Sequence, residues 1–560
     1  MKMKLLLMML VLISWKAIAQ PKGVPEYFNY PLAIKPRLNA NFGEMRPNHF
    51  HMGLDLSTES RENLPVYAPA DGFISRMKIE TGGFGRAIYL DHPNGTTTLY
   101  AHMNKFIPSA ENYLEEQQYA QETWKIDVKV PAGLLPVRKG QLIGYSGNTG
   151  ASQGPHVHFE IRDTKTENCL NPLRFRFLLP DITPPDVFRL VFYDRDKSVY
   201  EQSPVVYPLI KKGNNYIVAS RVELPFDKVF VAIQATDRMT GVPNANGIFA
   251  AKLKLDNQVM SSFTLDNFSY DQTRYLNGHI DYIHKTRGGN YYQMLFPAKN
   301  MDLPIYSSMD KHFTISDVEQ EAEIEVLDAY ENRSIVQFSI RRRPGNSVSL
   351  PKSGQLMKAG EVNIYDEEHI QFVFNEHAFY DDFHFSLQST YASAAHDASP
   401  VYQTFPTDIP VQNYFKVSIK ASKDLDLLNP DRLVLKRSYR GKIEIKKATK
   451  EKDGFSASFR DFGFFQLLHD IQPPQVSTHL HNGARLRSGS SIHFDVIDDL
   501  RFIREFKVTV DGKWLLFKPS GIRYSYVVDE HFPIGEHKLT VLVIDEAGNT
   551  VSKDFQVTRN

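Results

Sequence analysis

The sequence predicts a mainly β protein, in which a compact antiparallel β domain near the N-terminus is followed by several β-sandwich-like domains. Short runs rich in β-branched and aromatic residues, such as 65–68 and 97–100, are separated by turn residues such as Pro93-Asn94-Gly95. Pro-Pro pairs twice precede stretches in which apolar residues alternate with polar ones. With 42% hydrophobic and 23% charged residues among 560, the composition is that of a globular protein.

The first residues have the features of a secretory signal peptide. Lys2 and Lys4 precede a short apolar run, 5–13, and Ala17-Ile18-Ala19 forms a small-x-small cleavage site. The apolar run is too short to span a bilayer. We therefore expect a signal peptide at residues 1–19, no transmembrane anchor after its removal, and export to the periplasm, with secretion beyond it as the alternative.

Charge and cysteine content narrow the expected functions only slightly. Lys+Arg and Asp+Glu are both 65, so the formal net charge is zero, and a strongly basic nucleic-acid-binding surface is not expected. The single cysteine, Cys169, excludes an intramolecular disulfide. A free cysteine usually packs as a small hydrophobic residue, and we expect that role for Cys169.

Changes in composition divide the chain after the signal peptide into expected segments. The most distinctive lies first, because it is dense in Gly and His and holds the short strand-like runs described above. The expected segments are an extended stretch at 20–35; an antiparallel β domain at 36–178 with a polar, Glu/Gln-rich insertion at about 106–136; a β-sandwich-like domain with an insertion at 181–343; a β-rich domain at 344–470; and an immunoglobulin-like β-sandwich at 475–560.

Two parts of the later chain share the same short motifs. Each opens on an Asp followed three residues later by Pro-Pro, at Asp181 and at Asp470. Each later contains an Asp followed four residues on by Asn, beginning at Asp328 and at Asp545. Because a Pro-Pro pair cannot continue a central strand or helix, it marks a stiff entry into a new domain.

Histidine and aspartate patterns in residues 36–178 indicate a metal site. His156 and His158 are two residues apart in a strand-like run, so both imidazoles project from one face. His51 and Asp55 add a nitrogen and an oxygen ligand, and His102 is a fifth candidate. Nitrogen and carboxylate ligands suit Zn²⁺, and a catalytic zinc keeps only three protein ligands, so two of the five groups remain for proton transfer.

The same region resembles the lysostaphin-like zinc endopeptidases, the M23 or LytM peptidase family. The resemblance covers about a quarter of the chain and rests on several motifs. These are Phe42-Gly43 with Arg46, Phe50-His51-x-Gly53-x-Asp55, Pro65-Val66-Tyr67-Ala68-Pro69-Ala70-Asp71-Gly72, Gly82-Gly83-Phe84-Gly85, Tyr100-Ala101-His102, Lys139-Gly140-Gln141-Leu142-Ile143-Gly144, Ser146-Gly147-Asn148-Thr149-Gly150, Gly154-Pro155-His156-Val157-His158-Phe159-Glu160 and Asn171-Pro172-Leu173.

The resemblance implies a small antiparallel β fold that holds one zinc ion per catalytic domain. It assigns His51, Asp55 and His158 as zinc ligands and His102 and His156 as the unliganded catalytic pair, with the general base left open between the two. The implied activity is hydrolysis of peptide bonds in the stem or cross-bridge peptides of peptidoglycan, which would be the main partner. The long segment between His102 and Lys139 departs from the short link usual in the family.

Two alternatives to an active peptidase remain. Non-catalytic relatives of the LytM type activate other wall hydrolases, but such proteins characteristically lose metal ligands, whereas all five positions are filled here. The β-rich tail also suggests an adhesion or scaffold protein with an ancillary peptidase. In either case the C-terminal β domains are the expected contact for a protein partner.

Overall fold

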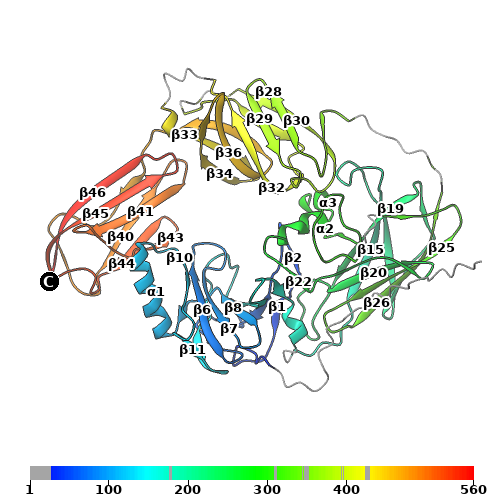
Figure 1. The fold of residues 1–560 in the computed structure, drawn as a ribbon, viewed down its shortest axis with the longest axis horizontal. Coiled ribbons are helices and arrows are strands. Elements are labelled where there is room, and N and C mark those ends of the chain that lie inside the picture. Colours follow the sequence, from blue (N-terminus) through cyan, green and yellow to red (C-terminus); the bar gives the residue numbers. More distant parts are fainter. Residues whose placement is uncertain are drawn as a thin grey trace, which may run out of the picture.

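The computed structural model describes residues 27–175, 179–307, 312–343, 345, 352–391, 394, 396–422 and 429–560. The predicted signal peptide at 1–19, and residues 20–26 of the predicted extended segment, lie outside the described residues. The chain is mainly β, which confirms the predicted fold class, and its sheets follow one another around a ring (Figure 1). In the part that the structure describes, no helix has both the length and the apolar character needed to cross a membrane.

The N-terminal unit, residues 27–175, is built on one antiparallel sheet. In spatial order its strands are β1 (Leu38–Ala40), β4 (Leu54–Ser57), β13 (His156–Asp163), β8 (Thr96–Ala101), β7 (Arg86–Asp91), β6 (Gly72–Ile79) and β10 (Ile126–Lys129). Smaller elements flank this sheet. They are β2 (Met45–Arg46), β3 (His49–Phe50), β5 (Pro65–Tyr67), β9 (Lys105–Phe106), α1 (Pro108–Gln121), β11 (Pro136–Val137), β12 (Leu142–Tyr145), β14 (Cys169–Leu170) and the 3-10 helix η1 (Pro172–Phe175).

The second unit, residues 179–343 apart from 308–311, is a larger β assembly. Its main path runs β21 (Gln258–Thr264), β20 (Ala250–Leu255), β25 (Gln320–Leu327), β26 (Arg333–Arg342), β17 (Asn215–Val218), β16 (Val205–Lys212), β15 (Asp186–Asp194), β19 (Lys228–Thr236) and β23 (Gln293–Met294). The remaining elements are β18 (Val222–Leu224), β22 (Asn267–Phe268), η2 (Thr273–Tyr275), α2 (Leu276–His279), α3 (Tyr282–Thr286) and β24 (Phe313–Thr314).

One continuous hydrophobic core spans the N-terminal and second units. Its buried residues form one cluster, whose first member in the sequence is Phe28 and whose last is Ile340. Strand β14 of the first unit pairs with β22 of the second, with Cys169 opposite Phe268. The fully buried ring of Phe268 also lies 4.9 Å from that of Phe42 and 5.2 Å from that of Phe50. Because these aromatic contacts exclude water from both sides of the junction, the two units pack as one body.

The third and C-terminal units each have two sheets around a core of their own. The third unit comprises β27 (Gln355–Met357), β28 (Asn363–Glu367), β29 (Ile370–Phe374), β30 (Phe383–Thr390), β31 (Val401–Phe405), β32 (Pro410–Ile419), η4 (Pro430–Arg432), β33 (Leu433–Tyr439), β34 (Lys442–Lys447), β35 (Thr449–Glu451), β36 (Gly454–Asp461) and β37 (Phe464–His469). The C-terminal unit comprises β38 (Gln475–Ser477), β39 (Ala484–Leu486), β40 (Ser491–Ile497), β41 (Ile503–Val510), β42 (Lys513–Trp514), β43 (Lys518–Ser520), β44 (Arg523–Val527), β45 (Gly535–Asp545) and β46 (Thr550–Arg559).

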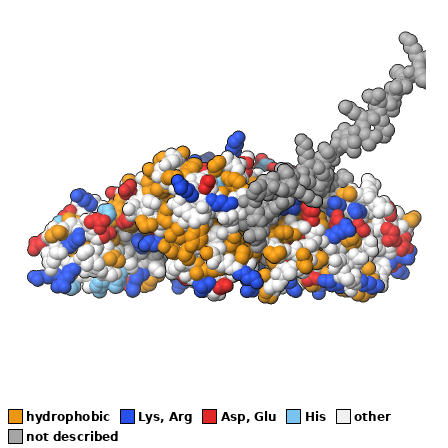
Figure 2. All heavy atoms as spheres, turned by 90° about the horizontal axis from the view of Figure 1, so that it is seen from below, with side chains coloured by type: hydrophobic (Ala, Val, Ile, Leu, Met, Phe, Trp, Pro, Cys, Tyr) orange, Lys and Arg blue, Asp and Glu red, His pale blue; other side chains and the backbone are white. Residues whose placement is uncertain are grey.

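The C-terminal unit returns to the N-terminal unit and closes the ring at helix α1, which lies in the predicted insertion (Figure 1). The ring of Tyr119 stacks on that of His531 at 3.8 Å and meets Trp514 edge-on at 5.3 Å. Beside them, Lys507 Nζ donates to Glu122 Oε2 at 2.5 Å. Figure 2 shows the ring edge-on, with basic and acidic side chains interspersed along this face.

Replacing Phe268 by alanine tests the shared core. We expect Phe268→Ala to lower the free energy of unfolding by about 3–5 kcal/mol, because it leaves a cavity between the two units. Denaturant unfolding followed by tryptophan and tyrosine fluorescence measures the loss. Phe188→Ala, at a 38% exposed position of the same unit, is the matched control and should cost much less. Separate unfolding of the two units, with only one of them shifted, would contradict the single core.

Candidate metal centre

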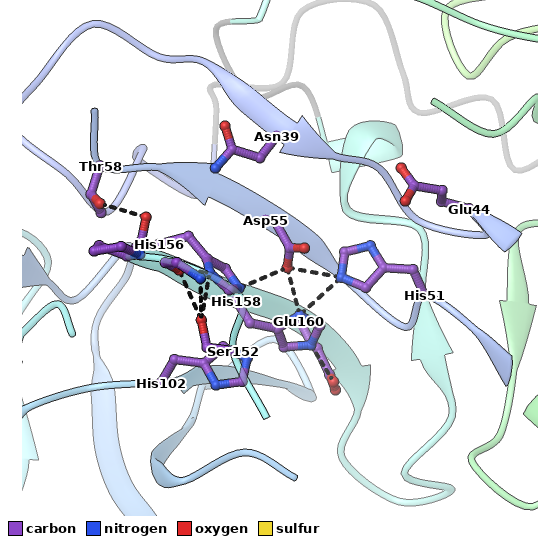
Figure 3. A network of polar contacts seen from close by, with 12 residues as sticks. Asn39, Glu44, His51, Asp55, Thr58, His102, Ser152, His156, His158 and Glu160 are labelled. Atoms are coloured by element: carbon purple, nitrogen blue, oxygen red, sulfur yellow. Dashed lines mark hydrogen bonds and ion pairs between the residues drawn. The ribbon is translucent and has the colours of Figure 1, made fainter. Parts of the chain in front are cut away.

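Strand register brings the predicted site residues together. Strand β13 lies between β4 and β8, with His158 directly opposite Asp55 on one side and Ala101 on the other. His102 follows Ala101 at the end of β8, so its ring also reaches this point. Figure 3 shows His51 and His158 on either side of the Asp55 carboxylate, with His156 and His102 beside them. All five residues of the predicted site thus converge.

The glycine between His51 and Asp55 is required by close packing of the backbone. A Cβ atom at Gly53 would lie 2.3 Å from the carbonyl oxygen of Phe159 on the neighbouring strand. Only glycine therefore lets the chain turn from β3 into β4 while pressed against β13. This contact explains the His-x-Gly-x-Asp spacing, because it fixes His51 and Asp55 on the same side of the sheet.

Three ligand atoms surround a single point. His51 Nε2 lies 2.9 Å from Asp55 Oδ1 and 3.0 Å from His158 Nδ1, and His158 Nδ1 lies 3.0 Å from the same Asp55 oxygen. The three side chains are almost fully buried. Two nitrogens and one carboxylate oxygen form a donor set typical of a catalytic zinc site with room for a fourth, non-protein ligand.

The outward-facing nitrogens fix how these rings are protonated. His51 Nδ1 lies 2.7 Å from the Asn41 carbonyl oxygen, and His158 Nε2 lies 2.8 Å from Glu160 Oε1. Both acceptors require an N–H on the ring, so the neutral rings turn the lone pairs of His51 Nε2 and His158 Nδ1 towards each other. Two lone pairs and a carboxylate at this distance repel unless a cation lies among them, so the residues fit a metal ion.

The pKa values of His51, His158 and Asp55 are shifted by their burial and by their close approach to one another. Burial lowers the pKa of His51 to about 4. Burial acts in the same direction on His158, but hydrogen bonds to Asp55 and Glu160 outweigh it and raise the pKa of His158 to about 9. The neighbouring histidines, which outweigh desolvation, hold the pKa of Asp55 well below its usual value. Without a metal, one proton on His158 therefore takes the place of the cation.

Charged groups outside the cluster hold the ligands in position. Arg46 Nη2 donates to the second oxygen of Asp55 at 2.5 Å, which leaves Oδ1 to face the histidines. Glu160 is completely buried, accepts from Arg162 Nε at 2.7 Å and from the hydroxyl of Tyr270, and so stays ionised beside His158. A buried carboxylate behind a ligand histidine raises the basicity of that ligand and fixes its orientation.

His102 and His156 form a second pair next to the three ligand groups. Their ring centroids are 4.7 Å apart. His102 Nδ1 lies 2.8 Å from the Thr149 carbonyl oxygen and His156 Nδ1 lies 2.8 Å from the Gly154 carbonyl oxygen, so both Nδ1 atoms are held by the backbone. His156 Nε2 lies 3.4 Å from Asp55 Oδ1. Burial and then the neighbouring His158 and His156 lower the pKa of His102 to about 3, which keeps it neutral.

Backbone strain marks the position of His102. Its φ of 61° lies in the left-handed region, which a β-branched or bulky residue rarely adopts. The hydrogen bond from its backbone N–H to the Phe84 carbonyl at 2.9 Å, together with the bond to Thr149, holds this conformation. Strain of this kind persists where surrounding contacts over-determine a functional side chain.

Sequence reasoning missed two groups that complete the site. Tyr270 belongs to the second unit, yet its hydroxyl donates to Glu160. The Asn41 carbonyl, which accepts from His51, is held because the Asn41 side chain exchanges two hydrogen bonds with the backbone of Gly247, also in the second unit. Neither has a motif of its own, because a tyrosine hydroxyl and a backbone carbonyl recur throughout any sequence.

The antiparallel β domain places two histidines and one aspartate around one point, with a second histidine pair beside them. These features define a protein with a candidate single-ion metal centre. Residues 49–121 and 125–172 match the profile of Peptidase family M23, and this part of the chain is an M23 domain, which confirms the resemblance seen in the sequence. Residues 354–470 match the profile of the Zu5-like domain.

Curated relatives match about a quarter to a third of the chain. "DD-carboxypeptidase/endopeptidase Mpg" of Neisseria meningitidis serogroup B is 32% identical over 174 residues, which cover 30% of this chain and 33% of Mpg. "Peptidoglycan DD-endopeptidase ShyA" of Vibrio cholerae serotype O1 is 28% identical over 24% of this chain and 26% of ShyA. The chain thus spans about a third or less of the length of these relatives.

Among solved structures, the catalytic domain of lysostaphin from Staphylococcus simulans is similar to part of this chain. The sequences are 24% identical where they align, and the alignment covers 25% of this chain and 91% of that chain with a TM-score of 0.18.

Metal content of variants tests which residues bind the ion. We expect about one Zn²⁺ per chain, lost in His158→Ala because the ligand set falls below three. His156→Ala should keep the zinc, and so should His49→Ala, whose ring lies near the motif but bonds to the Pro47 carbonyl oxygen. Elemental analysis after dialysis measures the stoichiometry. If folded His158→Ala still bound about one zinc ion per chain, His158 would not be a zinc ligand.

Glu160→Gln tests the carboxylate behind His158. The substitution keeps the shape but removes the charge, so we expect zinc affinity to fall about 10–100-fold. Competition with a chromogenic chelator measures the change. Glu116→Gln, on the exposed face of α1, is the matched control and should leave the affinity unchanged. Equal affinities in the two variants would show that Glu160 does not tune the site.

Proposed function

We propose that this chain is a zinc-dependent endopeptidase that hydrolyses peptide bonds in the stem or cross-bridge peptides of peptidoglycan. The observation that carries the proposal is the convergence of His51, Asp55 and His158 on one point with the His102–His156 pair directly beside them. In this proposal the first three residues hold the zinc ion. When bound, the ion supplies Lewis acidity for the scissile carbonyl and lowers the pKa of water in the site.

The histidine pair supplies proton transfer. His102 presents an unprotonated Nε2, because its ring is neutral and its Nδ1 hydrogen is committed to the Thr149 carbonyl. His156 Nδ1 is held by the Gly154 carbonyl, and its Nε2 lies 3.4 Å from Asp55 Oδ1. A neutral imidazole in this state accepts a proton from water as a general base. The ring that gains the proton becomes a cation and can then donate a hydrogen bond to the oxyanion or protonate the leaving amine. The geometry leaves either ring free to act first.

The peptidoglycan assignment draws on the relatives. Mpg is named a DD-carboxypeptidase/endopeptidase and ShyA a peptidoglycan DD-endopeptidase, and they are similar to 30% and 24% of this chain. Export across the inner membrane, predicted from residues 1–19, would bring the chain to this substrate. The C-terminal β units then provide surfaces for a protein partner or for positioning on the wall.

Digestion of purified sacculi tests the activity. We expect the mature chain to release muropeptides, to lose this activity in a chelator, and to regain it when zinc is restored. His102→Ala and His156→Ala should keep their zinc while the rate falls about 10²–10⁴-fold, because each removes a proton-transfer group. Mass analysis of the products identifies the bond that is cut.

Two results would overturn the proposal. Release of muropeptides that persists after the metal is removed would exclude the zinc mechanism. A zinc-loaded wild-type chain that releases nothing, but stimulates another wall hydrolase added to the same sacculi, would instead support the non-catalytic regulator that the sequence leaves as the alternative.

A further inference from the structure

Three aspartates of the second unit form a buried cluster far from the histidines in sequence. Asp181 precedes β15, Asp237 directly follows β19 and Asp328 directly follows β25. One carboxylate oxygen from each lies within 4.8 Å of the others, and the residues are only 7%, 3% and 1% exposed. Among the described residues, none of the three carboxylates has a basic partner within 4.0 Å. Three buried and unpaired carboxylates would repel strongly as they stand.

The backbone holds two of these carboxylates in fixed orientations. Asp181 Oδ1 accepts from the N–H groups of Thr183 and Thr240 at 2.9 and 3.0 Å. Asp328 Oδ1 accepts from the N–H of Asn332 at 2.8 Å. The other oxygen of Asp181, Oδ2, and one oxygen of Asp237, Oδ1, are buried without any hydrogen-bond partner. Backbone hydrogen bonds therefore fix the orientation of two carboxylates, while two carboxylate oxygens of the cluster have no hydrogen-bond partner.

An unpartnered amide beside the cluster points independently to a missing ligand. Asn246 is 3% exposed, and neither Oδ1 nor Nδ2 of its side chain has a partner. Its backbone exchanges two hydrogen bonds with Asp237, at 2.8 and 3.0 Å, so the two residues are directly opposed in an antiparallel bridge. Directly opposed residues project from the same face, which places the amide next to the Asp237 carboxylate.

Protonation alone does not satisfy this site. Burial and the nearby charge of Asp328 raise the pKa of Asp237 to about 8, and burial raises the pKa of Asp328 to about 6. A proton on Asp237 would remove one charge of three, but its single O–H can donate to only one of the Asp181 oxygen and the Asn246 amide oxygen and would leave the other unpaired. A cation bound among them would meet all of these oxygens at once.

The donor chemistry identifies the cation. The cluster offers only carboxylate and amide oxygens, without nitrogen or sulfur, which suits a hard divalent ion rather than zinc. Calcium accepts six to eight oxygens in flexible geometry and can complete its shell with water. We propose that Asp181, Asp237, Asp328 and the amide oxygen of Asn246 bind one Ca²⁺ ion.

This ion would fasten the linker and the metal centre of the first unit to the second. Asp181 lies in the Pro-Pro linker that joins the two units, while the segment carrying Asp237 and Asn246 continues into Gly247. Gly247 exchanges hydrogen bonds of 2.8 and 2.9 Å with the side chain of Asn41, whose carbonyl accepts from His51. Bound calcium would thus hold the segment at Gly247, which supports the predicted zinc ligand His51 through Asn41.

The C-terminal unit repeats part of this arrangement, as its sequence motif predicts. Asn549 donates its N–H to Asp545 at 2.8 Å and its side-chain amide to the Asp470 carbonyl at 3.0 Å, as Asn332 does to Asp328 and Asp181 in the second unit. In the repeat, however, Lys447 of the third unit brings positive charge close by, donating to the Ala547 carbonyl at 2.7 Å. In the second unit the Ala329 carbonyl accepts from Arg174 at 3.0 Å in a similar way, but among the described residues none of the three aspartate carboxylates has a basic partner within 4.0 Å, so the geometry still supports calcium there.

Calcium titration of the full chain tests the proposal. Protein freed of metal with a chelator and then desalted is titrated with CaCl₂ alone, by calorimetry and by thermal unfolding. We expect calcium to bind and to raise the Tm of the wild type by several degrees, because it binds only the folded state. In the chelator, at a pH above 8 where Asp237 is ionised, Asp237→Asn should melt at or above the wild-type Tm, since a buried charge is gone. In calcium the order should reverse.

Control variants separate this site from other effects. Asp256→Asn makes the same chemical change at an exposed hairpin of the same unit and should respond to calcium as the wild type does. His158→Ala should also keep the calcium response, so failure of the zinc proposal and of this one are distinguishable. If Asp237→Asn does not fold, Asp181→Asn replaces it in the same calcium titration. A wild-type Tm that calcium leaves unchanged, or an equal shift in Asp237→Asn, would overturn the site.

Discussion

The antiparallel register of β13 between β4 and β8 is the constraint on which the metal centre depends. It places His158 opposite Asp55 and Ala101, and the two-residue period of the strand then puts His156 and Glu160 on the same face. A slip of one residue would turn all three side chains to the opposite side. Glycine at position 53 protects this register, because no larger residue lets β4 approach β13 so closely.

The centre is completed by groups from outside its own sheet. Tyr270 reaches Glu160 from the second unit, and Gly247 fixes Asn41 behind His51 from the same unit. These contacts are possible because a single core fuses the two units around Phe268. Orientation of His51 and His158 thus rests on packing between units. The second unit is therefore part of the structure that pre-organises the site, and not an independent attachment.

Local patterns made the mainly β class and the convergence of the five candidate site residues predictable, since strand period and motif spacing are properties of short segments. The contacts of Tyr270 and Asn41 could not be predicted, because packing joins residues more than a hundred positions apart in the first case and more than two hundred in the second. The aspartate cluster lies between these extremes. Asp181 and Asp328 stand in a visible repeat, but Asp237 joins them only through the order of strands β15, β19 and β25.

Helix α1 of the predicted insertion connects the junction between the N-terminal and C-terminal units to the His102–His156 pair. Its last turn carries Tyr119, which stacks on His531 of the C-terminal unit. Its first turn carries Glu111, which accepts from Arg86 at 2.6 Å, and the Arg86 N–H in turn donates to Thr149, whose carbonyl orients His102. The described contacts at the ring closure are the Tyr119 stack with His531 and Trp514 and the Lys507–Glu122 ion pair, whereas the opposite junction is a continuous core. The C-terminal unit can influence His102 along this route only if α1 has two discrete arrangements, because coupling between distant groups needs an element whose equilibrium both of them bias.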